Sequence, residues 1–267
     1  TRAAGHGPRQ APSAGVEESF VAATFAWHSE AASAEILKKW VLEKKMMQKV
    51  EDWQPAAAFR EQWSAWTKFL QEWRRMQTDC KDPANRKAML AKWKDKKRKA
   101  EAGGAGDGDE ETEGEEGKAS EINVDDLDVF VVEDATAIGN GEPLFQHLVY
   151  EDWALLCICY RLHHLLHSFN KDSNNHGRPS FTEERMPFYY NKYFKKSFSL
   201  KHFSVEEFKD FLDLIRDTAT KDEAGPFLQA VCDEDTPLAS FVKVTEDQRR
   251  ERVRRIDAGD ETAKLRF

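Results

Sequence analysis

The sequence lacks the features that would place it in several large classes of protein. Its 267 residues hold no apolar run near the roughly 20 residues that a membrane-spanning helix needs, and the longest, Trp153 to Cys159, is far shorter. Its four cysteines, Cys80, Cys157, Cys159 and Cys232, do not have the spacing of a disulfide framework. We therefore expect a protein that is not an integral membrane protein and that resides in a reducing compartment, the nucleus or the cytosol.

Catalytic signatures are missing as well. The chain contains no glycine-rich phosphate loop, no Gly-x-Ser-x-Gly elbow, no His-Glu-x-x-His motif and no dinucleotide-binding fingerprint. The two glycines between Gly139 and Glu142 have no third glycine that opens a helix, so they predict a turn. The sequence thus predicts a protein that is not an enzyme and needs no cofactor. An enzyme of unrecognised type stays an alternative, because isolated carboxylates and histidines nominate no site.

Charge is present in quantity and is segregated along the chain. The net charge is -8, yet the first 100 residues are basic and the next segment is strongly acidic. The acidic block from Glu101 to Glu121 has no large apolar residue, so burial cannot offset the entropy of ordering it. We expect a disordered linker over 101–126. It is either a solvated spacer, a segment that folds back on the basic region, or a site for phosphorylation at Thr112 and Ser120.

These shifts in composition divide the chain into five segments. They are a disordered N-terminal end (1–15), a Trp-rich helical domain that ends in a basic tract (16–100), the acidic linker (101–126), a helical core domain (127–244), and a basic C-terminal helix with its tail (245–267). The first residues contain no initiator Met and no apolar stretch, which is typical of a fragment or a processed end. The predicted fold is mainly α: a helical hairpin N-terminal domain and a helical C-terminal domain with at most one or two short strands.

The Trp-rich region has the period of amphipathic helices. Five apolar residues recur at spacings of three and four, on a helix that Pro55 opens: Phe59, Trp63, Trp66, Leu70 and Trp73. We expect this stripe to pack against the preceding helix, from about Ser33 to Val50, in an antiparallel hairpin. The region ends in the cluster Lys96, Lys97, Arg98 and Lys99. Such a cluster is a nuclear localisation signal, a nucleic-acid patch or simply a solvated helix face.

The C-terminal region begins with Val129 to Val132, which predicts a short strand or extended segment. Residues 150–169 then predict a helix with a wide apolar arc and a narrower polar arc. The polar arc comprises Cys157, Tyr160, Arg161, His164 and His167. A metal site at Cys159, His163 and His167 is disfavoured, because no second pair of ligands follows.

Aromatic and lysine residues alternate from Met186 to Phe203. This density suits a strand of nucleic acid, with bases stacked on the rings. A helix over 189–198 instead places the rings on one face, toward the core, and leaves Lys192, Lys195 and Lys196 on the other. We favour the helix, because a strand would mix rings and lysines on one face. The remaining lysine stripe would recognise charge and not sequence.

Two helix starts are predicted from capping boxes, at Ser204 to Glu207 and at Thr245 to Gln248. The second opens a basic helix that Gly259 ends. Its arginines are Arg249, Arg250, Arg252, Arg254 and Arg255. They either contact phosphates or pair with Glu251, Asp247 and the acidic linker.

The loop at 172–183 resembles a calcium-binding loop in part. Asp172, Asn174 and Glu183 fall at its first, third and twelfth positions. His176 and Pro179 depart from the pattern, and no second loop follows, so a turn between helices is the competing interpretation.

The sequence therefore predicts a non-enzymatic interaction or scaffold protein whose basic helical faces contact nucleic acid or acidic protein partners. RNA is favoured over DNA, and no small-molecule substrate is inferred. The alternative is a metal- or calcium-responsive binding domain that uses the 172–183 loop.

Overall fold

The computed structural model describes residues 28–51, 53–102, 127–138, 141–173, 180–222 and 225–267. Within these residues the protein is mainly α-helical, as the sequence predicted. The chain divides into two compact units, residues 1–45 and residues 46–267. The predicted disordered end at 1–15 and most of the predicted linker at 101–126 lie outside the described residues.

The first unit contributes helix α1 (Glu30–Met47), whose last residues cross into the second unit. Its large apolar side chains Ile36, Leu37 and Trp40 are all exposed. The sequence predicted that the aromatic stripe at residues 59–73 would cover them in a helical hairpin, but that stripe packs within the second unit.

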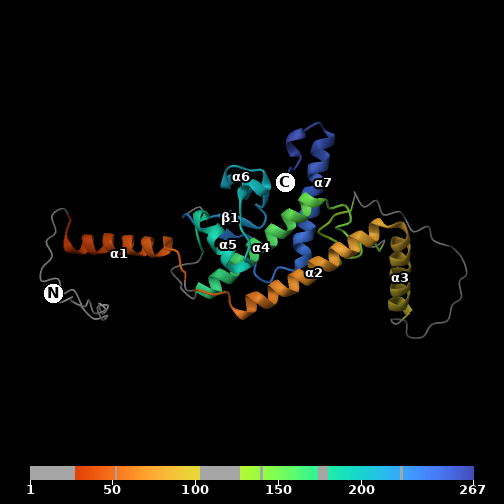
Figure 1. The fold of residues 1–267 in the computed structure, drawn as a ribbon, viewed down its shortest axis with the longest axis horizontal. Helices are drawn as coiled ribbons and strands as arrows, with labels where there is room; N and C mark the ends of the chain where they lie inside the picture. Colours follow the sequence, from red (N-terminus) through yellow and green to blue (C-terminus); the bar gives the residue numbers. More distant parts are fainter. Residues whose placement is uncertain (1–27, 52, 103–126, 139–140, 174–179, 223–224) are drawn as a thin grey trace, which may run out of the picture. The chain divides into compact units, whose positions relative to one another are not determined.

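The second unit contains the remaining elements, which Figure 1 labels where there is room. Its α-helices are α2 (Ala57–Lys81), α3 (Pro83–Ala102), α4 (Tyr150–Ser173), α5 (Met186–Phe194), α6 (Phe208–Leu214) and α7 (Leu238–Asp257). Its 3₁₀ helices are η2 (Glu183–Arg185), η3 (Leu200–Phe203) and η4 (Glu261–Ala263). Its strands β1 (Ala219–Lys221) and β2 (Leu228–Ala230) pair antiparallel, with Ala219 opposite Ala230.

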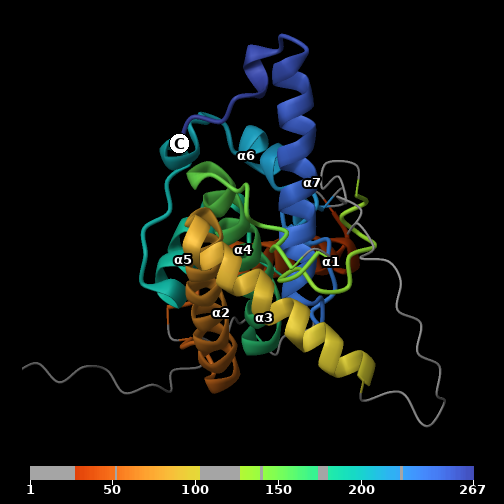
Figure 2. The same cartoon turned by 90° about the vertical axis from the view of Figure 1, so that its right-hand side faces the viewer.

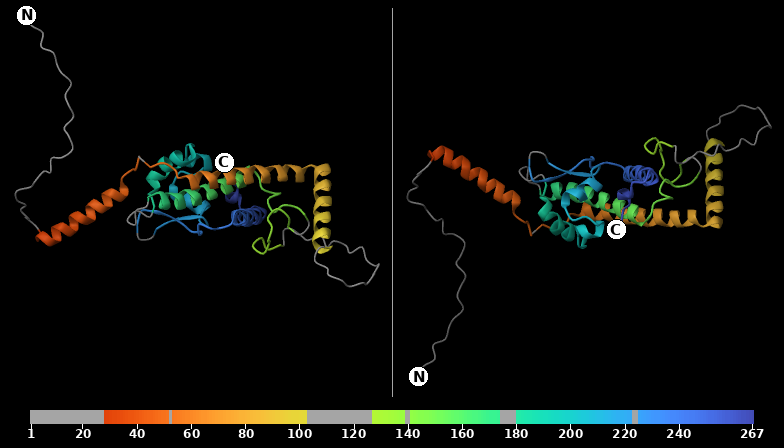
Figure 3. Two further views of the ribbon diagram at one scale, coloured as in Figure 1. Left: turned by 90° about the horizontal axis from the view of Figure 1, so that it is seen from below. Right: turned by 90° about the horizontal axis from the view of Figure 1, so that it is seen from above.

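Helix α4 is the centre of the second unit and lies between α2 and α7 (Figures 2 and 3). Cys157, Tyr160 and His164, which the sequence placed on a polar arc, are all buried. The Tyr160 ring stacks on Trp66 of α2 at 4.0 Å and meets Phe241 of α7 edge-on at 5.6 Å. The expected polar arc is therefore wrong at these residues, because helices cover both sides of α4.

The aromatic stripe of α2 covers one side of α4. Phe59 stacks on the His164 ring at 4.5 Å, and Trp63 meets Phe194 of α5 at 4.8 Å. Trp66 is fully buried. The stripe itself is confirmed, but its partners are α4 and α5. The core of the second unit thus contains residues from both sides of the acidic segment.

Helix α5 is shorter than the predicted helix over 189–198. Its rings Tyr189, Tyr190, Tyr193 and Phe194 are buried, which confirms that most rings of this segment belong to the core. The helix ends at Phe194, and Lys195 follows in the left-handed conformation with φ of 55°.

Three local predictions are wrong. Val129 to Val131 form a turn, and the two strands occur later in the chain. Ser204 does not cap a helix; it follows η3 with φ of 53°. Thr245 lies inside α7, where its hydroxyl donates to the Phe241 carbonyl at 2.8 Å, so the predicted boundary at 245 falls within a continuous helix. The predicted stop is confirmed, because Gly259, with φ of 93°, follows Ala258, the C-cap of α7.

No helix in the described part of the chain is both long enough and apolar enough to cross a lipid bilayer.

Candidate anion-binding site

The arginines in the middle of α7 serve the fold. Arg249 and Arg250 donate to the buried Glu246 carboxylate at 2.7 and 2.9 Å. Arg250 also donates to the Leu127 carbonyl at 2.6 Å, and Arg252 pairs with the buried Asp152. Two buried carboxylates thus hold these three arginines against the fold, and phosphate contact by Arg249, Arg250 and Arg252 stays a prediction.

The last two arginines of α7 are exposed but are paired too. Arg254 donates to Glu251 at 2.9 Å, which is the pairing that the sequence offered as an alternative. Arg255 contacts Asp260 at 2.6 and 2.9 Å. Hydrogen bonds from Thr262 and Arg255 lower the pKa of the Asp260 carboxyl. The charge on α7 is thus largely compensated by neighbouring carboxylates.

The cluster at the end of α3 is helical, and its exposed members do not converge. Lys96, Arg98 and Lys99 are exposed, and Arg98 pairs with Asp95 at 3.3 Å. The side chain of Lys97 lies outside the described part. Successive residues of a helix are rotated by about 100°, so four consecutive cations do not share one face. The cluster therefore offers charge without forming a shaped site.

The calcium-loop residues are only partly described. Asp172 lies in the last turn of α4, where it accepts a hydrogen bond from the Tyr193 hydroxyl at 2.7 Å. Glu183 opens η2 and pairs with Lys221 at 3.3 Å. Asn174 lies outside the described residues. Among the residues that are described, no three histidine, cysteine or acidic side chains come together as a metal site. Ion binding at 172–183 stays a prediction.

The three lysines of the predicted stripe behave differently from one another. Lys192 donates to the Glu51 carbonyl, and its ammonium lies 5.6 Å from the centre of the Phe188 ring. Lys195 and Lys196 are exposed and form no ion pair with any residue that the structure describes. Only the last two thus keep an uncompensated charge.

Lys195 and Lys196 line a pocket of about 650 Å³, which we call the cationic pocket. It lies among α2, α4 and the segment from α5 to η3. Its basic side chains are Arg74, Arg161, Lys195, Lys196 and His202. Its aromatic side chains are Tyr150, Trp153, Tyr190, Phe198 and Phe203. The volume is within the roughly 300–1,000 Å³ typical of ligand sites.

No carboxylate is among the described residues that line this pocket. Arg161 donates to the Tyr190 hydroxyl at 2.8 Å, and its Nε is buried without a partner among described residues. The nearby Arg161 charge, followed by burial, lowers the pKa of the Lys196 ammonium. These observations show that cations from separate elements repel one another here and that a donor lacks an acceptor.

The aromatic residues hold two of the cations in place. The Arg161 guanidinium lies 5.5 Å from the centre of the Trp63 ring, and that of Arg74 lies 5.5 Å from the Trp153 ring, which is a cation–π distance. Tyr150, at the first residue of α4, is 71% exposed. The pocket therefore has fixed guanidinium groups and one ring that is free to stack on a ligand.

The Cys157 thiol also lines the pocket. Burial raises its pKa, and the charges of Arg161, Arg74 and Lys196 partly offset this effect. A thiol with a raised pKa is a poor nucleophile, so we assign it to the apolar wall of the pocket.

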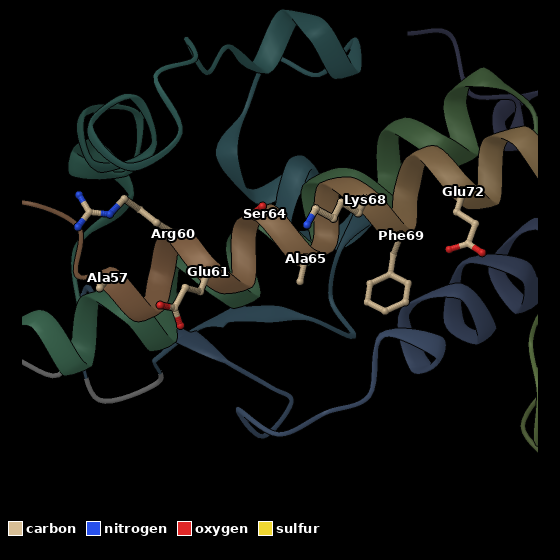
Figure 4. Close-up of a pocket in the computed structure, with 8 residues that line it drawn as sticks. All are labelled: Ala57, Arg60, Glu61, Ser64, Ala65, Lys68, Phe69 and Glu72. Carbon is tan, nitrogen blue, oxygen red and sulfur yellow. The ribbon is translucent and has the colours of Figure 1, made fainter.

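A second hollow follows the outer face of α2 and shows what distinguishes the cationic pocket. Figure 4 shows Glu61, Phe69 and Glu72 extending from one side of this helix. Arg60 and Lys68 line the same hollow. Because carboxylates and cations are mixed and all come from one helix, this surface has no reason to prefer an anion.

Sequence reasoning found Lys195 and Lys196 but missed Arg74, Arg161, Tyr150 and His202. Arg161 was recognised only as a polar residue of the central helix. The missed residues lie on different elements, so no spacing along the chain connects them. A cation that interrupts an otherwise apolar helix, as Arg161 does, is the one signal that was available.

Comparison of the chain with protein families, with curated proteins and with solved structures finds no match.

Proposed function

We propose that this protein is a non-enzymatic interaction protein that binds single-stranded nucleic acid, and RNA in particular, through the cationic pocket. The observation that carries the proposal is the convergence of Arg74, Arg161, Lys195 and Lys196 on a pocket whose described lining contains no carboxylate. These four side chains come from three separate parts of the chain, so the tertiary fold creates the site.

Phosphate is the anion that suits these groups. Guanidinium groups bind phosphate oxygens through charge-assisted, often bidentate hydrogen bonds. Arg161 is half-buried and has a buried Nε without a partner, so a phosphate oxygen would supply a missing acceptor. The ligand's negative charge would also relieve the repulsion between Arg161 and Lys196.

The aromatic rim favours nucleic acid over an acidic protein. Bases stack on exposed rings in single strands, which contributes about 1–3 kcal/mol per base. Tyr150 offers such a ring at the pocket, whereas an acidic peptide supplies carboxylates and no base to stack. Since phosphates and stacking carry little sequence information, we expect binding that tolerates many sequences.

Backbone strain at Lys195 also supports a role for this residue. Left-handed conformation costs a residue with a Cβ about 1–2 kcal/mol, and glycine avoids that cost. The chain nevertheless has a lysine at this position, with φ of 55°. Strained residues cluster at functional sites, which agrees with a ligand contact by its charge.

The proposal is tested by measuring the affinity for a fluorescent single-stranded RNA dodecanucleotide as a function of salt. We expect affinity to fall steeply with salt, with a slope that reports the phosphates contacted. The double variant Lys195→Glu, Lys196→Glu should lower affinity at least about tenfold, because it reverses two charges at the pocket. Excess poly-glutamate distinguishes the partners: RNA binding should survive it, and displacement would favour an acidic protein partner.

The matched control is the double variant Lys68→Glu, Lys209→Glu, which changes net charge equally. Both of these lysines are exposed and neither lines the cationic pocket. The control should bind RNA within about twofold of the unchanged protein. The proposal is wrong if the unchanged protein shows no salt-sensitive RNA binding. It is also wrong if the control variant loses as much RNA affinity as the pocket variant.

A further inference from the structure

A second basic pocket lies where α2 meets α3, and we call it the basic corner. It has a volume of about 530 Å³, and its cations are Lys81, Arg86, Lys87 and Lys94. None of the described residues that line it is a carboxylate. It therefore shares the main electrostatic feature of the cationic pocket.

The corner is held in a fixed shape by contacts on its other side. Asp82, between the two helices, accepts a hydrogen bond from the Ala84 amide at 3.0 Å, and Arg86 pairs with the buried Glu142. Side chains of Leu90 and Trp93 lie against Gly141, where an added Cβ would be about 3.0 Å from the Trp93 ring. This close contact anchors α3 to the segment before α4.

Three of the four cations at the corner have no compensating charge among the described residues. Lys81, Lys87 and Lys94 form no ion pair with any residue in the described ranges, whereas Arg86 is neutralised by Glu142. Lys87 and Lys94 are seven residues apart on α3, so both face the same side of that helix.

Both pockets border helix α2. Arg74 lines the cationic pocket and Lys81 lines the basic corner, and a spacing of seven residues places both on one face of the helix. At about 1.5 Å of rise per residue they are about 10 Å apart along the axis. A stacked strand with one phosphate per roughly 3.4 Å places about three phosphates over that length.

We infer that one single strand occupies both pockets and runs along α2 between them, so that the ligand is an oligonucleotide and not a mononucleotide. This inference rests on the proposed function. Linked contacts make the second pocket bind at a high effective concentration, so affinity should rise sharply once a strand is long enough to reach both. Removal of the corner cations should therefore affect long strands alone.

The test compares a 5′-phosphorylated uridine dinucleotide, whose two phosphates are about 3.4 Å apart when stacked and do not span the roughly 10 Å between the pockets, with a uridine dodecanucleotide at low salt. We expect the double variant Lys87→Glu, Lys94→Glu to weaken the dodecanucleotide about tenfold or more and to leave the dinucleotide within about twofold. The salt slope for the dodecanucleotide should fall by at least about one, since each phosphate contact on a single strand contributes about 0.7. Both lysines are exposed, and circular dichroism checks that the variant folds.

The matched control is Lys92→Glu, Lys209→Glu, which changes net charge equally at two exposed lysines that line neither pocket. It should stay within about twofold of the unchanged protein for both strands. Equal weakening by the control, or no effect of the corner variant on the dodecanucleotide, would overturn the inference. A duplex that binds as tightly as the single strand would overturn the single-strand assignment. The proposed function fails separately, if neither strand binds the unchanged protein.

Discussion

At the scale of single residues, Lys195 combines a conformational cost with an uncompensated charge. Its φ of 55° places it in the region that glycine occupies most easily. Its amide donates to the Asn191 carbonyl at 2.8 Å, so the residue completes the end of α5 whatever its side chain. Its conformation and its charge can thus be separated by substitution.

We predict that Lys195→Gly raises the free energy of unfolding by about 1 kcal/mol while it weakens RNA binding. Lys195→Ala should weaken binding to the same extent without the gain in stability, because alanine keeps the strained Cβ. Urea denaturation and RNA titration of both variants measure the two effects. Unchanged RNA affinity in both variants would show that the lysine charge has no role in binding.

The buried histidine His163 predicts a dependence of stability on pH. Burial, followed by the charge of His167, lowers its pKa to about 4 from the ordinary 6.5. In the unfolded chain His163 therefore binds a proton below about pH 6.5, whereas in the folded chain it binds that proton only below about pH 4. The contribution of neutral His163 to the free energy of unfolding is fully present above pH 6.5. It decreases by about 2–3 kcal/mol as the pH falls through this window.

His163→Phe should reduce that loss, since the variant cannot take up the proton in the unfolded state. The His163 ring lies 5.0 Å from Phe241 and its Nδ1 is buried without a described partner, so phenylalanine keeps the packing and loses only the hydrogen bond with the Glu234 backbone. Chemical denaturation between pH 7 and pH 4 measures the difference. The exposed His147, changed to Gln, is the control and should follow the unchanged protein. An identical pH profile for His163→Phe would contradict this assignment.

At the scale of elements, helix α2 illustrates what periodicity can and cannot predict. The spacing of its aromatic residues correctly predicts one buried stripe, because a side chain's position around a helix follows from its number. The partner of that stripe does not follow from spacing. The neighbouring helix in the sequence was the natural candidate, but α4 offers rings and apolar side chains at matching distances.

We predict that Trp66→Ala lowers the free energy of unfolding by about 3–5 kcal/mol, because the ring is fully buried against Tyr160. Trp66→Phe should cost less than about half of that. The indole nitrogen of Trp66 is buried without a described partner, so the phenylalanine variant loses contact area but no hydrogen bond. Equilibrium denaturation of both variants measures the costs. Equal losses in the two variants would show that the indole nitrogen does have a partner.

Helix α4 shows the same limit from the opposite direction. Its apolar arc was predicted, and its polar arc was expected to face solvent. Tyr160 and His164 are instead buried, and the His164 Nε2 is hydrogen-bonded to the Phe59 carbonyl at 3.1 Å. Polar side chains of this kind can be buried when a group on another helix forms a hydrogen bond with them. The sequence does not show which group will do so.

At the scale of the whole molecule, the described core is continuous across the acidic segment. It begins with Phe59 on α2 and extends to Val242 on α7. The sequence predicted separate domains at 16–100 and 127–244, with the segment 101–126 between them. The core contacts of α2 instead link residues on both sides of that segment.

We predict that a fragment from residue 46 to residue 267 unfolds with the same midpoint as the full chain, because it contains all of the core residues named above. A fragment from residue 127 to residue 267 should not unfold cooperatively, since loss of α2 uncovers one side of α4. Thermal denaturation followed by circular dichroism compares the three chains. A cooperative transition in the shorter fragment would establish 127–267 as an independent domain.

The sequence by itself determined the helical class, the position of α4, the buried stripe of α2 and the burial of most rings between Met186 and Phe203. Each of these depends on local periodicity, which one segment of chain specifies alone. The tertiary structure decided which charges are neutralised: Glu246 and Asp152 engage the α7 arginines, whereas Arg74, Lys195 and Lys196 stay without ion pairs in the described chain. That outcome depends on distances between elements far apart in sequence, because an ion pair forms only where folding brings two charges within a few ångströms.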